Sequence, residues 1–258
     1  MLKHRWVSLF FILILLIYGL LVYKFSFDIF GLLAILLIYS GILAWGSFYI
    51  GSQYYMPVVS KGKTDQKLLS ITFDDGPHEK NTSEILRILK KYDATACFFI
   101  IGKNIQGREE IIKQLDHANH LLGNHSWEHS VYTDFLSKKK LKEEVEKTNQ
   151  EIEKITGKKL AFFRPPFGIT NPNIAHTIKA LHMYAIGWNI RSLDTRSDLT
   201  KEKVIDRIKK RIKPGSIILL HDSTNEIGTI LEELLIILQQ MNYKVVPLDQ
   251  LTGVKAYK

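Results

Sequence analysis

The chain has 258 residues, a net charge of +9 and a single cysteine. This length accommodates one large domain with an appendage, and one cysteine excludes an internal disulfide. The positive charge is spread along predicted helices, for example at 138–140 and 209–213, which is typical of solvated helix faces; we therefore expect no nucleic-acid partner, although an anionic lipid or glycan would be attracted.

Two apolar runs open the chain, at 7–23 and 29–50, with a short polar connection between them. A membrane-spanning helix needs about 17 to 25 apolar residues, so both runs are long enough. A cleaved signal peptide is the alternative for the first run, but residues 25–28 are bulky and lack the small-residue pattern of a cleavage site. We therefore predict two transmembrane helices within residues 1–51, forming a hairpin in a bacterial-type cell membrane, with the lipid bilayer as a partner.

The distribution of positive charge predicts the side of the membrane. Lys3 and Arg5 precede the first run, the connection is neutral, and Lys61, Lys63 and Lys67 follow the second run. The positive-inside rule then puts both ends, and with them the large domain, in the cytoplasm. If only one run spans the membrane, the domain lies outside instead.

After residue 66 the pattern alternates between strands and helices. Strands are predicted at 68–75, 96–102, 121–125, 161–165, 183–189, 216–221 and 244–248, and helices at 81–92, 108–118, 137–156, 172–181, 200–212 and 227–241. Such alternation implies parallel strands with right-handed crossovers. Seven units favour a distorted seven-stranded (β/α) barrel over residues 68–258, with 52–67 as a linker. A doubly wound open sheet is the structural alternative.

The local sequence also predicts two helix caps and the environment of the single cysteine. We expect Asn81, Thr82 or Ser83 to cap the first helix of the domain, and Asn171 to cap the fourth. Cys97 lies in an apolar strand, which predicts a small buried residue.

The first strand of the domain ends in two adjacent carboxylates, Asp74 and Asp75, followed by Gly76 and Pro77. Adjacent strand residues point to opposite faces, but the turn at Gly76 can re-aim the second carboxylate. Two acids at one strand tip repel each other unless a cation or a proton lies between them. This pattern predicts a metal site or an acid/base site, with an ordinary polar turn as the alternative.

Other polar residues also follow strand ends, where β/α barrels gather their active sites. His125 and His129 are four residues apart, which in a helical turn puts both imidazoles on one side. Two histidines with one carboxylate suit a divalent metal of the zinc type with one position left open. The remaining polar residues at strand ends are Arg164, Trp188, Asp194 and His221, whereas His117, His120, His176 and His182 are interpreted as structural.

Four ordered motifs carry a resemblance to a known family. They are Thr-Phe-Asp-Asp-Gly-Pro at 72–77, His-Ser-Trp-Glu-His at 125–129, Arg-Pro-Pro-Phe-Gly at 164–168 and Leu-Leu-His-Asp at 219–222. The chain resembles the NodB-type polysaccharide deacetylases, carbohydrate esterase family 4, over about residues 66–250. The resemblance implies metal-dependent hydrolysis of an N-acetyl group on an amino sugar. The implied substrate is an N-acetylated glycan, a polysaccharide or peptidoglycan, and no protein partner is predicted.

The resemblance assigns a role to each matching residue. Asp75, His125 and His129 would hold the metal, most simply zinc, with cobalt or nickel as alternatives. Asp74 would be the general base that takes a proton from the attacking water, and Arg164 would pair with it and keep it ionised.

The resemblance also implies residues around the acyl group. His221 would be the general acid that protonates the departing amine, because a group titrating near neutrality suits that step. Leu219 would form a wall of the pocket for the acetyl methyl group. The Phe167 backbone N–H would help to hold the oxyanion.

One motif departs from the family pattern. The family usually has Asp-Trp where this chain has Asp194 and Thr195. Asp194 can still act as the carboxylate partner of His221. The missing tryptophan leaves part of the acyl pocket open unless Trp188 or Trp127 fills it, so acetyl and formyl remain open as the acyl group.

Two other functions compete with a polysaccharide deacetylase. One is a deacylase or deformylase of a lipid-linked sugar precursor, which a membrane hairpin and a cytoplasmic domain would suit. The other is an inactive glycan-binding protein held at the membrane. Retention of the base, the three ligands and the acid argues against the inactive protein. The identity and length of the glycan and the oligomeric state stay open.

Overall fold

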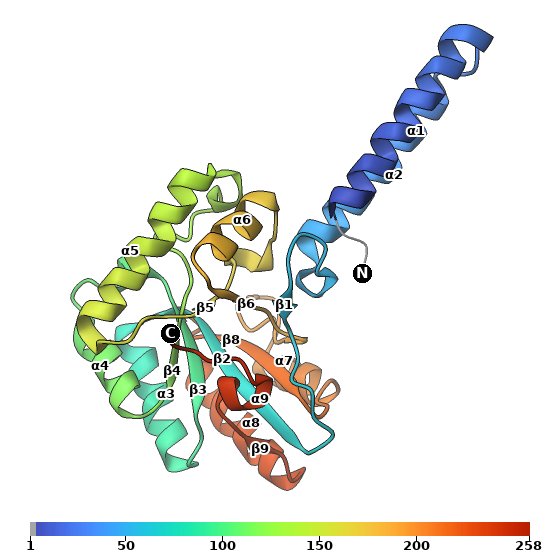
Figure 1. Cartoon of the computed structure of the whole chain (residues 1–258). Helices are drawn as coiled ribbons and strands as arrows, with labels where there is room; N and C mark the ends of the chain where they lie inside the picture. The colour runs from blue at the N-terminus through green and yellow to red at the C-terminus, as the bar shows by residue number, and fades with distance from the viewer. Residues whose placement is uncertain (1–3) are drawn as a thin grey trace.

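A curled sheet of parallel strands forms the centre of the structure, a computed structural model that describes residues 4–258 (Figure 1). Lys3, one of the charges counted above, lies outside the described residues. The strands are β1 Val58–Val59, β2 Leu68–Gly76, β3 Ala96–Ile100, β4 Leu121–Asn124, β5 Phe162–Phe163, β6 Tyr184–Ile186, β7 Ile190–Arg191, β8 Ser216–His221 and β9 Lys244–Val245. Their order is β1-β6-β5-β4-β3-β2-β8-β7, and β9 pairs with β2. The predicted distorted β/α barrel is confirmed.

The sheet has more strands than the seven predicted. The predicted strand at 183–189 corresponds to β6, which ends at Ile186 and pairs with β5 and β1. β7 begins beyond the predicted range, at Ile190, and pairs with β8. The chain between them therefore crosses from one end of the strand order to the other and curls the sheet. Gly187 N donates to Val59 O at 2.9 Å on one side, and Asn189 N donates to Ile217 O at 3.3 Å on the other.

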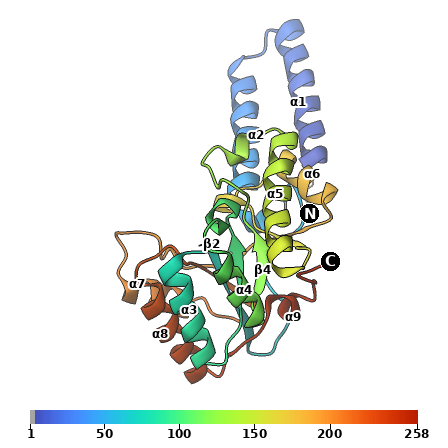
Figure 2. The same cartoon turned by 90° about the vertical axis from the view of Figure 1, so that its left-hand side faces the viewer.

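Helices cover the outer face of the sheet (Figure 2). They are α3 Glu79–Lys91, α4 Glu109–His117, α5 Lys138–Thr156, α6 Pro172–Ala180, α7 Lys201–Lys209 and α8 Ile227–Gln240. A further helix that was not predicted, α9 Leu248–Thr252, packs instead against the inward-facing residues of the strands. Asn171 caps α6 as expected, accepting from Ile174 N. The expected cap of α3 was wrong: the helix begins earlier, and the His78 ring accepts from Asn81 N.

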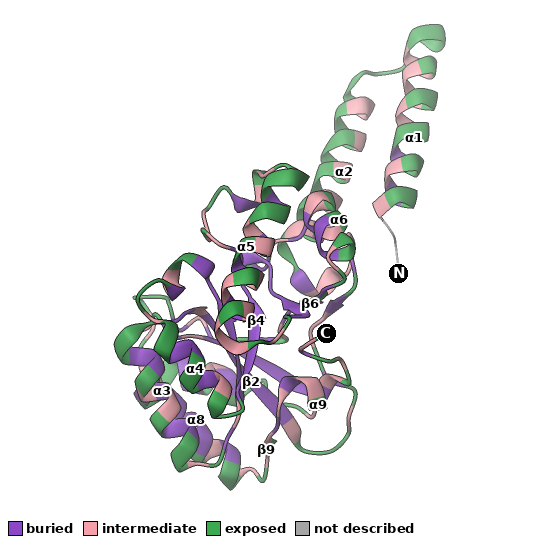
Figure 3. Cartoon of the chain, turned by 60° about the vertical axis from the view of Figure 1, so that its left-hand side comes forward, coloured by how far each residue is buried: buried purple, intermediate pink, exposed green. Residues whose placement is uncertain are grey.

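Buried residues are concentrated in the strands and on parts of the helices (Figure 3), and their side chains form two clusters. Alternate residues of the strands, such as Ile71 and Phe73 of β2, point outward and pack against the helices. The other set points into the barrel, where Cys97, buried as predicted, packs with Phe99 and Phe162. Because the interior is filled, the carboxyl ends of the strands hold the polar residues above it in fixed positions.

The amino-terminal hairpin projects from the domain and exposes apolar side chains (Figures 1 and 2). It consists of α1 His4–Phe25 and α2 Phe30–Phe48. Among the described residues, only Val7 and Phe11 of α1 and Gly46 of α2 are buried, which excludes the core helices of a soluble domain. At 1.5 Å per residue the helices are about 33 and 28 Å long, close to the hydrocarbon thickness of about 30 Å.

The segment that joins hairpin and domain is packed rather than free. Part of the expected linker, 52–67, forms β1, and Ile50 just before it lies in the core between sheet and helices. Thr170, two residues before α6, ties the domain to the end of α2. Its backbone N–H donates to Ser47 O at 3.1 Å, and its hydroxyl donates to Gly46 O at 3.2 Å. The hairpin is therefore held directly against the domain.

We predict that Gly123→Ala destabilises the domain. A Cβ at Gly123 would lie 2.5 Å from the Phe99 ring inside the barrel, so the ring must shift within a packed core. Overpacking of this kind costs about 1 to 3 kcal/mol of the free energy of unfolding. Thermal unfolding of the detergent-solubilised chain, followed by near-ultraviolet circular dichroism, measures the loss. Gly41→Ala, where nothing lies within 4 Å of the added Cβ, is the matched control and should leave the transition unchanged.

Candidate active site

A β-bulge at the end of β2 brings the two adjacent carboxylates toward the same space. The pairing of β2 with β3 shifts register between Asp74 and Gly76, and Asp75 between them has φ 75°. A left-handed residue of this kind is rare outside glycine and cancels the strand alternation. Asp75 itself therefore makes the turn that the sequence analysis assigned to Gly76. Asp74 keeps its inward direction, as does Thr72 two residues earlier.

Asp75, His125 and His129 come together as a candidate metal centre. Asp75 Oδ1 lies 3.7 Å from His125 Nε2 and 3.6 Å from His129 Nε2. Two ligands at about 2.1 Å from a tetrahedral cation are about 3.4 Å apart, so this spacing fits a bound ion. Asp75 Oδ1 is also buried, and no hydrogen-bond partner lies near it among the described residues. The predicted residues thus fit a divalent cation, with the donor set that zinc prefers.

The surroundings keep both histidines in the form that a metal requires. His125 Nδ1 donates to Arg164 O at 2.8 Å, because a carbonyl oxygen can only accept, and this leaves Nε2 free to ligate. Burial, with a smaller contribution from the neighbouring His129, lowers the pKa of His125 to about 3. Burial also lowers the pKa of His129. Both rings are therefore neutral near pH 7, as metal binding requires.

The loop that carries the two histidines is not the helical turn predicted from their spacing. Ser126 and His129 have left-handed backbones, with φ 63° and 49°. A carboxylate oxygen of Glu144 on α5 accepts from Trp127 N at 3.0 Å and Glu128 N at 2.8 Å. These contacts, rather than helical hydrogen bonds, bring the rings to a centroid distance of 4.6 Å. The role of Glu144 was missed, since nothing in its local sequence distinguishes it from other acidic residues of this helix.

Asp74 is paired with a fully buried arginine, as predicted. Arg164 Nη1 donates to Asp74 Oδ1 at 2.6 Å, and the Arg164 side chain has no solvent exposure. The other oxygen, Asp74 Oδ2, lies 3.6 Å from His125 Nε2, beside the candidate cation position. Burial raises the pKa of Asp74, and the Arg164 charge opposes that rise. A cation between the ligands would oppose it further.

His221 and Asp194 form a second catalytic-type pair on the opposite side of Asp74. The parallel register places His221 directly beside Asp74, on the neighbouring strand β8. His221 Nδ1 donates to Asp194 Oδ1 at 2.8 Å, and the His221 N–H donates to Asp194 Oδ2 at 2.8 Å. Burial lowers the pKa of His221, but the hydrogen bond and charge of Asp194 outweigh it and raise the pKa to about 8. Ser192, which was not predicted, holds Asp194 by donating to Oδ1 at 2.6 Å.

The predicted acyl-pocket residues lie at this end of the barrel. Leu219 is buried on β8, two residues before His221 and therefore on the same inward side of the strand. Phe167 is left-handed, with φ 56°, and its ring lies 4.7 Å from that of His129. Phe167 is thus partly exposed beside His129, whereas Leu219 is buried below His221.

The two tryptophans considered for the acyl pocket lie in different places. Trp188 has its ring centre 5.5 Å from the Arg164 guanidinium, and its ring lies where a Cβ on Gly168 would be. Trp127 packs toward α5, with Lys147 Nζ 3.6 Å above its ring. Of the two, only Trp188 therefore lies next to the arginine that pairs with Asp74.

Asp222 is a buried residue of the site whose role was not predicted. Thr82 donates to Asp222 Oδ2 at 2.6 Å, and Asn81 Nδ2 donates to Asp222 O at 2.8 Å. The Asp222 N–H donates to Asp74 O at 3.2 Å. Burial raises the pKa of Asp222 to about 7, although the Thr82 hydrogen bond opposes the shift. Asn81 and Thr82, expected as helix caps, instead fix the strand end next to the base.

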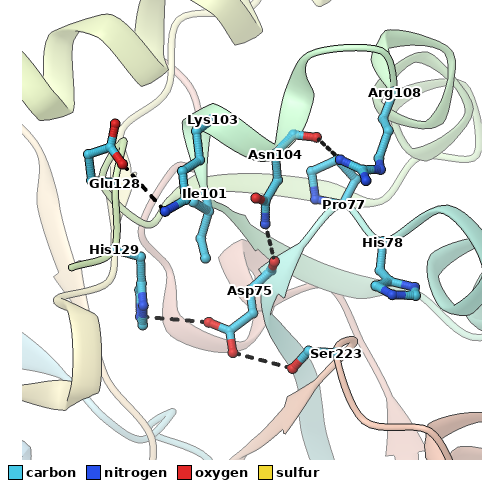
Figure 4. Close-up of a pocket in the computed structure, with 10 residues that line it drawn as sticks. All are labelled: Asp75, Pro77, His78, Ile101, Lys103, Asn104, Arg108, Glu128, His129 and Ser223. Carbon is cyan, nitrogen blue, oxygen red and sulfur yellow. Dashed lines mark hydrogen bonds and ion pairs between the residues drawn. The ribbon is translucent and has the colours of Figure 1, made fainter. Parts of the chain in front are cut away.

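A pocket of about 340 Å³ opens over Asp75 and His129 (Figure 4). In this view Asp75 is the centre of the contacts: His129 approaches one carboxylate oxygen, Ser223 the other, and Asn104 Nδ2 donates to its carbonyl at 2.8 Å. Arg108 lies across the pocket, and its Nε is buried with no partner among the described residues.

The fold and the site define a β/α-barrel hydrolase with a candidate metal centre. The profile of the family described as polysaccharide deacetylase matches residues 61–186. The chain is 31% identical over 196 residues to the peptidoglycan-N-acetylglucosamine deacetylase of Bacillus cereus, a match that covers 74% of this chain and 91% of that protein. It therefore belongs to the polysaccharide deacetylase family. The predicted resemblance to carbohydrate esterase family 4, and with it the enzyme class, is confirmed.

Other relatives support this assignment. The chain is 34% identical over 192 residues to the peptidoglycan-N-acetylmuramic acid deacetylase PdaC of Bacillus subtilis; the match covers 74% of this chain but 40% of that protein, so the chain spans about two fifths of PdaC. The solved structure of PdaC has a TM-score of 0.68 at 32% identity, covering 74% of this chain and 92% of the solved one. A family 4 pseudoenzyme from Bacillus anthracis has a TM-score of 0.70 at 27% identity, covering 76% of this chain and 68% of that one.

We predict that Asp75→Asn and His129→Gln each weaken zinc binding by more than about 100-fold. Loss of a residue that merely orients a ligand costs about 10- to 100-fold, and loss of a ligand costs more. Competition of the purified chain with a chromophoric zinc chelator measures the affinity. His117→Gln is the matched control, because His117 is exposed on α4. Wild-type affinity in the two ligand variants would show that the metal binds elsewhere.

Proposed function

We propose that this protein is a membrane-anchored, metal-dependent hydrolase that removes N-acetyl groups from amino sugars of a cell-wall glycan. One observation carries the proposal. A buried base, Asp74, paired with Arg164, lies between a ligand trio and the His221–Asp194 pair. Hydrolysis of an unreactive amide requires a cation site, a base and an acid close together, and this arrangement supplies all three.

Asp75, His125 and His129 would hold the cation. When bound, a divalent cation there supplies a Lewis acid for the amide carbonyl and acidifies water. Asp74 Oδ2 is the free carboxylate oxygen on this side, since Arg164 occupies Oδ1. It accepts the proton of the attacking water, and the buried guanidinium keeps the carboxylate oriented during this transfer.

His221 supplies the proton for the leaving amine. An amine is a poor leaving group until it is protonated, so the acid must carry its proton at working pH. The Asp194 carboxylate holds the Nδ1–H at 2.8 Å, which directs the Nε2–H of the protonated ring toward the substrate. The Phe167 N–H stabilises the oxyanion, and Leu219 limits the room for the acyl group. This role for Leu219 favours a small acyl group such as acetyl.

The relatives support a cell-wall substrate. Those of Bacillus cereus and Bacillus subtilis are named for N-acetylglucosamine and N-acetylmuramic acid of peptidoglycan. Arg108 adds an observation from the pocket, because its guanidinium lines the pocket and can donate to an anionic group. A carboxylate-bearing sugar would satisfy that donor. We therefore propose peptidoglycan or its precursor as substrate.

An inactive glycan-binding protein is the competing function, and a family 4 pseudoenzyme is among the similar structures. The geometry of this chain favours activity. The three ligand atoms converge on one point, and both the base and the acid retain their buried partners. A protein that only bound glycan would have no need for a buried arginine paired with a carboxylate beside the ligand trio.

The hairpin is proposed as the membrane anchor of the deacetylase domain, 68–258. Its two helices are long and apolar enough to cross a bilayer, and their side chains are exposed along most of their length. Aromatic residues lie at both ends, Trp6 and Trp45 near the domain and Tyr23 and Phe30 at the far end, as in membrane-interface belts.

We predict that Asp74→Asn abolishes acetate release from N-acetylated peptidoglycan fragments, with a loss of kcat of at least about 1,000-fold, while zinc affinity stays within about threefold. The asparagine keeps the size of the side chain and removes only its capacity to accept the proton. Acetate is measured by a coupled enzymatic assay and zinc by chelator competition. Substantial activity in this variant would remove Asp74 from the mechanism.

The pKa of His221 predicts an alkaline limit of activity. His221 must be protonated, and its pKa of about 8 means that kcat/KM falls as the pH rises through about 8. Asp194→Asn removes the carboxylate that raises this pKa, so the alkaline limb should move down toward the ordinary histidine value of about 6.5. The pH dependence of kcat/KM for both proteins checks the shift. An alkaline limb at the same pH in both proteins would exclude His221 as the acid.

A further inference from the structure

The loop between β4 and α5 exposes large apolar side chains. Val131 is 65% exposed, Tyr132 71% and Phe135 85%. Phe135 is among the most exposed apolar residues of the domain, although a soluble surface normally exposes such side chains singly. Three such side chains within five residues therefore indicate contact with an apolar environment outside the domain.

This loop belongs to the same hydrogen-bonded unit as the membrane hairpin. Asn171 Nδ2 donates to Asp134 O at 2.7 Å, and Asn173 Nδ2 donates to Leu136 O at 3.1 Å, which ties the loop to the start of α6. The preceding residue, Thr170, is bound to the end of α2 as described above. Thr170 binds α2, and the neighbouring Asn171 and Asn173 bind the loop. These contacts together fix the position of the loop relative to α2.

Figure 2, in which the hairpin is upright, places the loop before α5 at the level of the last turns of α2. Those turns carry exposed aromatic residues themselves: Trp45 is 52% exposed and Phe48 71%. Aromatic residues concentrate where a membrane helix leaves the hydrocarbon. The aromatic residues of the loop thus lie at the depth expected for the membrane interface.

The positive charge that follows the loop in the sequence also suits a membrane interface. Lys138, Lys139 and Lys140, at the start of α5, are all exposed. Apolar and aromatic side chains followed by lysines are typical of segments that lie in the bilayer interface, where the ammonium groups reach the anionic headgroups. A glycan would use the aromatic rings for stacking, but it would have no use for Val131.

We propose that the β4–α5 loop inserts Val131, Tyr132 and Phe135 into the same leaflet that α2 leaves, so that the active-site face of the domain lies on the bilayer. This inference rests on the proposed function and anchor. It assigns to the site a substrate class: glycan that is joined to lipid, or otherwise held at the membrane surface. The sugar must enter between the domain and the headgroups, next to Phe167, which is 44% exposed on this face.

Lipid contact of the loop is tested directly. Phe135→Cys is labelled with an environment-sensitive fluorophore in the full chain, in vesicles of phosphatidylcholine and phosphatidylglycerol; the native Cys97 is buried. Lipids brominated in their acyl chains should quench this label. Lys244→Cys, exposed on β9 at the other end of the barrel, is the matched control and should not be quenched. Equal, weak quenching at both positions would overturn the proposal.

The substrate class is tested with the triple variant Val131→Ser, Tyr132→Ser, Phe135→Ser. We expect an unchanged rate on a soluble N-acetylated peptidoglycan fragment and a loss of about tenfold on the same fragment attached to a lipid in the vesicle, because the site is no longer oriented toward it. An equal loss on both substrates would mean that the loop binds glycan and would overturn membrane seating. If the parent chain hydrolyses neither substrate, the proposed function fails, while the quenching result still decides whether the loop is inserted.

Discussion

The buried ion pair of Arg164 and Asp74 is the interaction on which the rest of the site depends. A guanidinium without solvent contact must have its donors satisfied, and here they reach four acceptors: Thr72 Oγ1, Asp74 Oδ1, Ile186 O and Gly187 O. These acceptors belong to β2 and to the end of β6, so the pair joins elements on opposite sides of the barrel. The Phe99 ring, 3.9 Å below the guanidinium, closes the interior under it.

The charges around this pair explain why the site fits a divalent cation. Four carboxylates, Asp74, Asp75, Asp194 and Asp222, gather at the ends of β2, β7 and β8, and the positive groups buried among them are Arg164 and the titrating His221. Asp222 responds to the excess, since burial and its acidic neighbours raise its pKa to about 7. Asp75 Oδ1 remains without a partner among the described residues. A cation between Asp75 and the two neutral histidines would balance this excess at its centre.

Strand ends and motifs were predictable from the sequence because long buried strands carry a clear apolar pattern. β2 and β8 therefore appear where they were expected, and they bring Asp74 and His221 into register. The two-residue strands β1 and β7 have no alternation to detect and exist only through their partners. The bulge at Asp75 and the support of Glu144 for the histidine loop were also beyond prediction, since each depends on contacts between segments distant in sequence.

Several residues of the site have left-handed backbones. Asp75, at the end of β2, has positive φ, as do Ser126, His129, Phe167 and Leu193 in the loops that follow other strands. Such conformations cost of order 1 to 3 kcal/mol each and persist only where the surrounding contacts impose them. The filled barrel interior and the buried Arg164 network impose them here, so the fold stabilises a geometry that the isolated loops would not adopt.

The same rigidity extends to the hairpin. The first turn of α1 and the end of α2 lie together at the domain, where His4 N donates to Tyr54 O at 3.3 Å. If both helices span the bilayer, the amino terminus and the domain share one side of it. A domain in the cytoplasm would meet lipid-linked precursors, and a domain outside would meet the growing polymer where it leaves the membrane. Because Thr170 binds α2 next to the motif that supplies Arg164 and Phe167, the proposed seating would restrict either reaction to sugars near the headgroups.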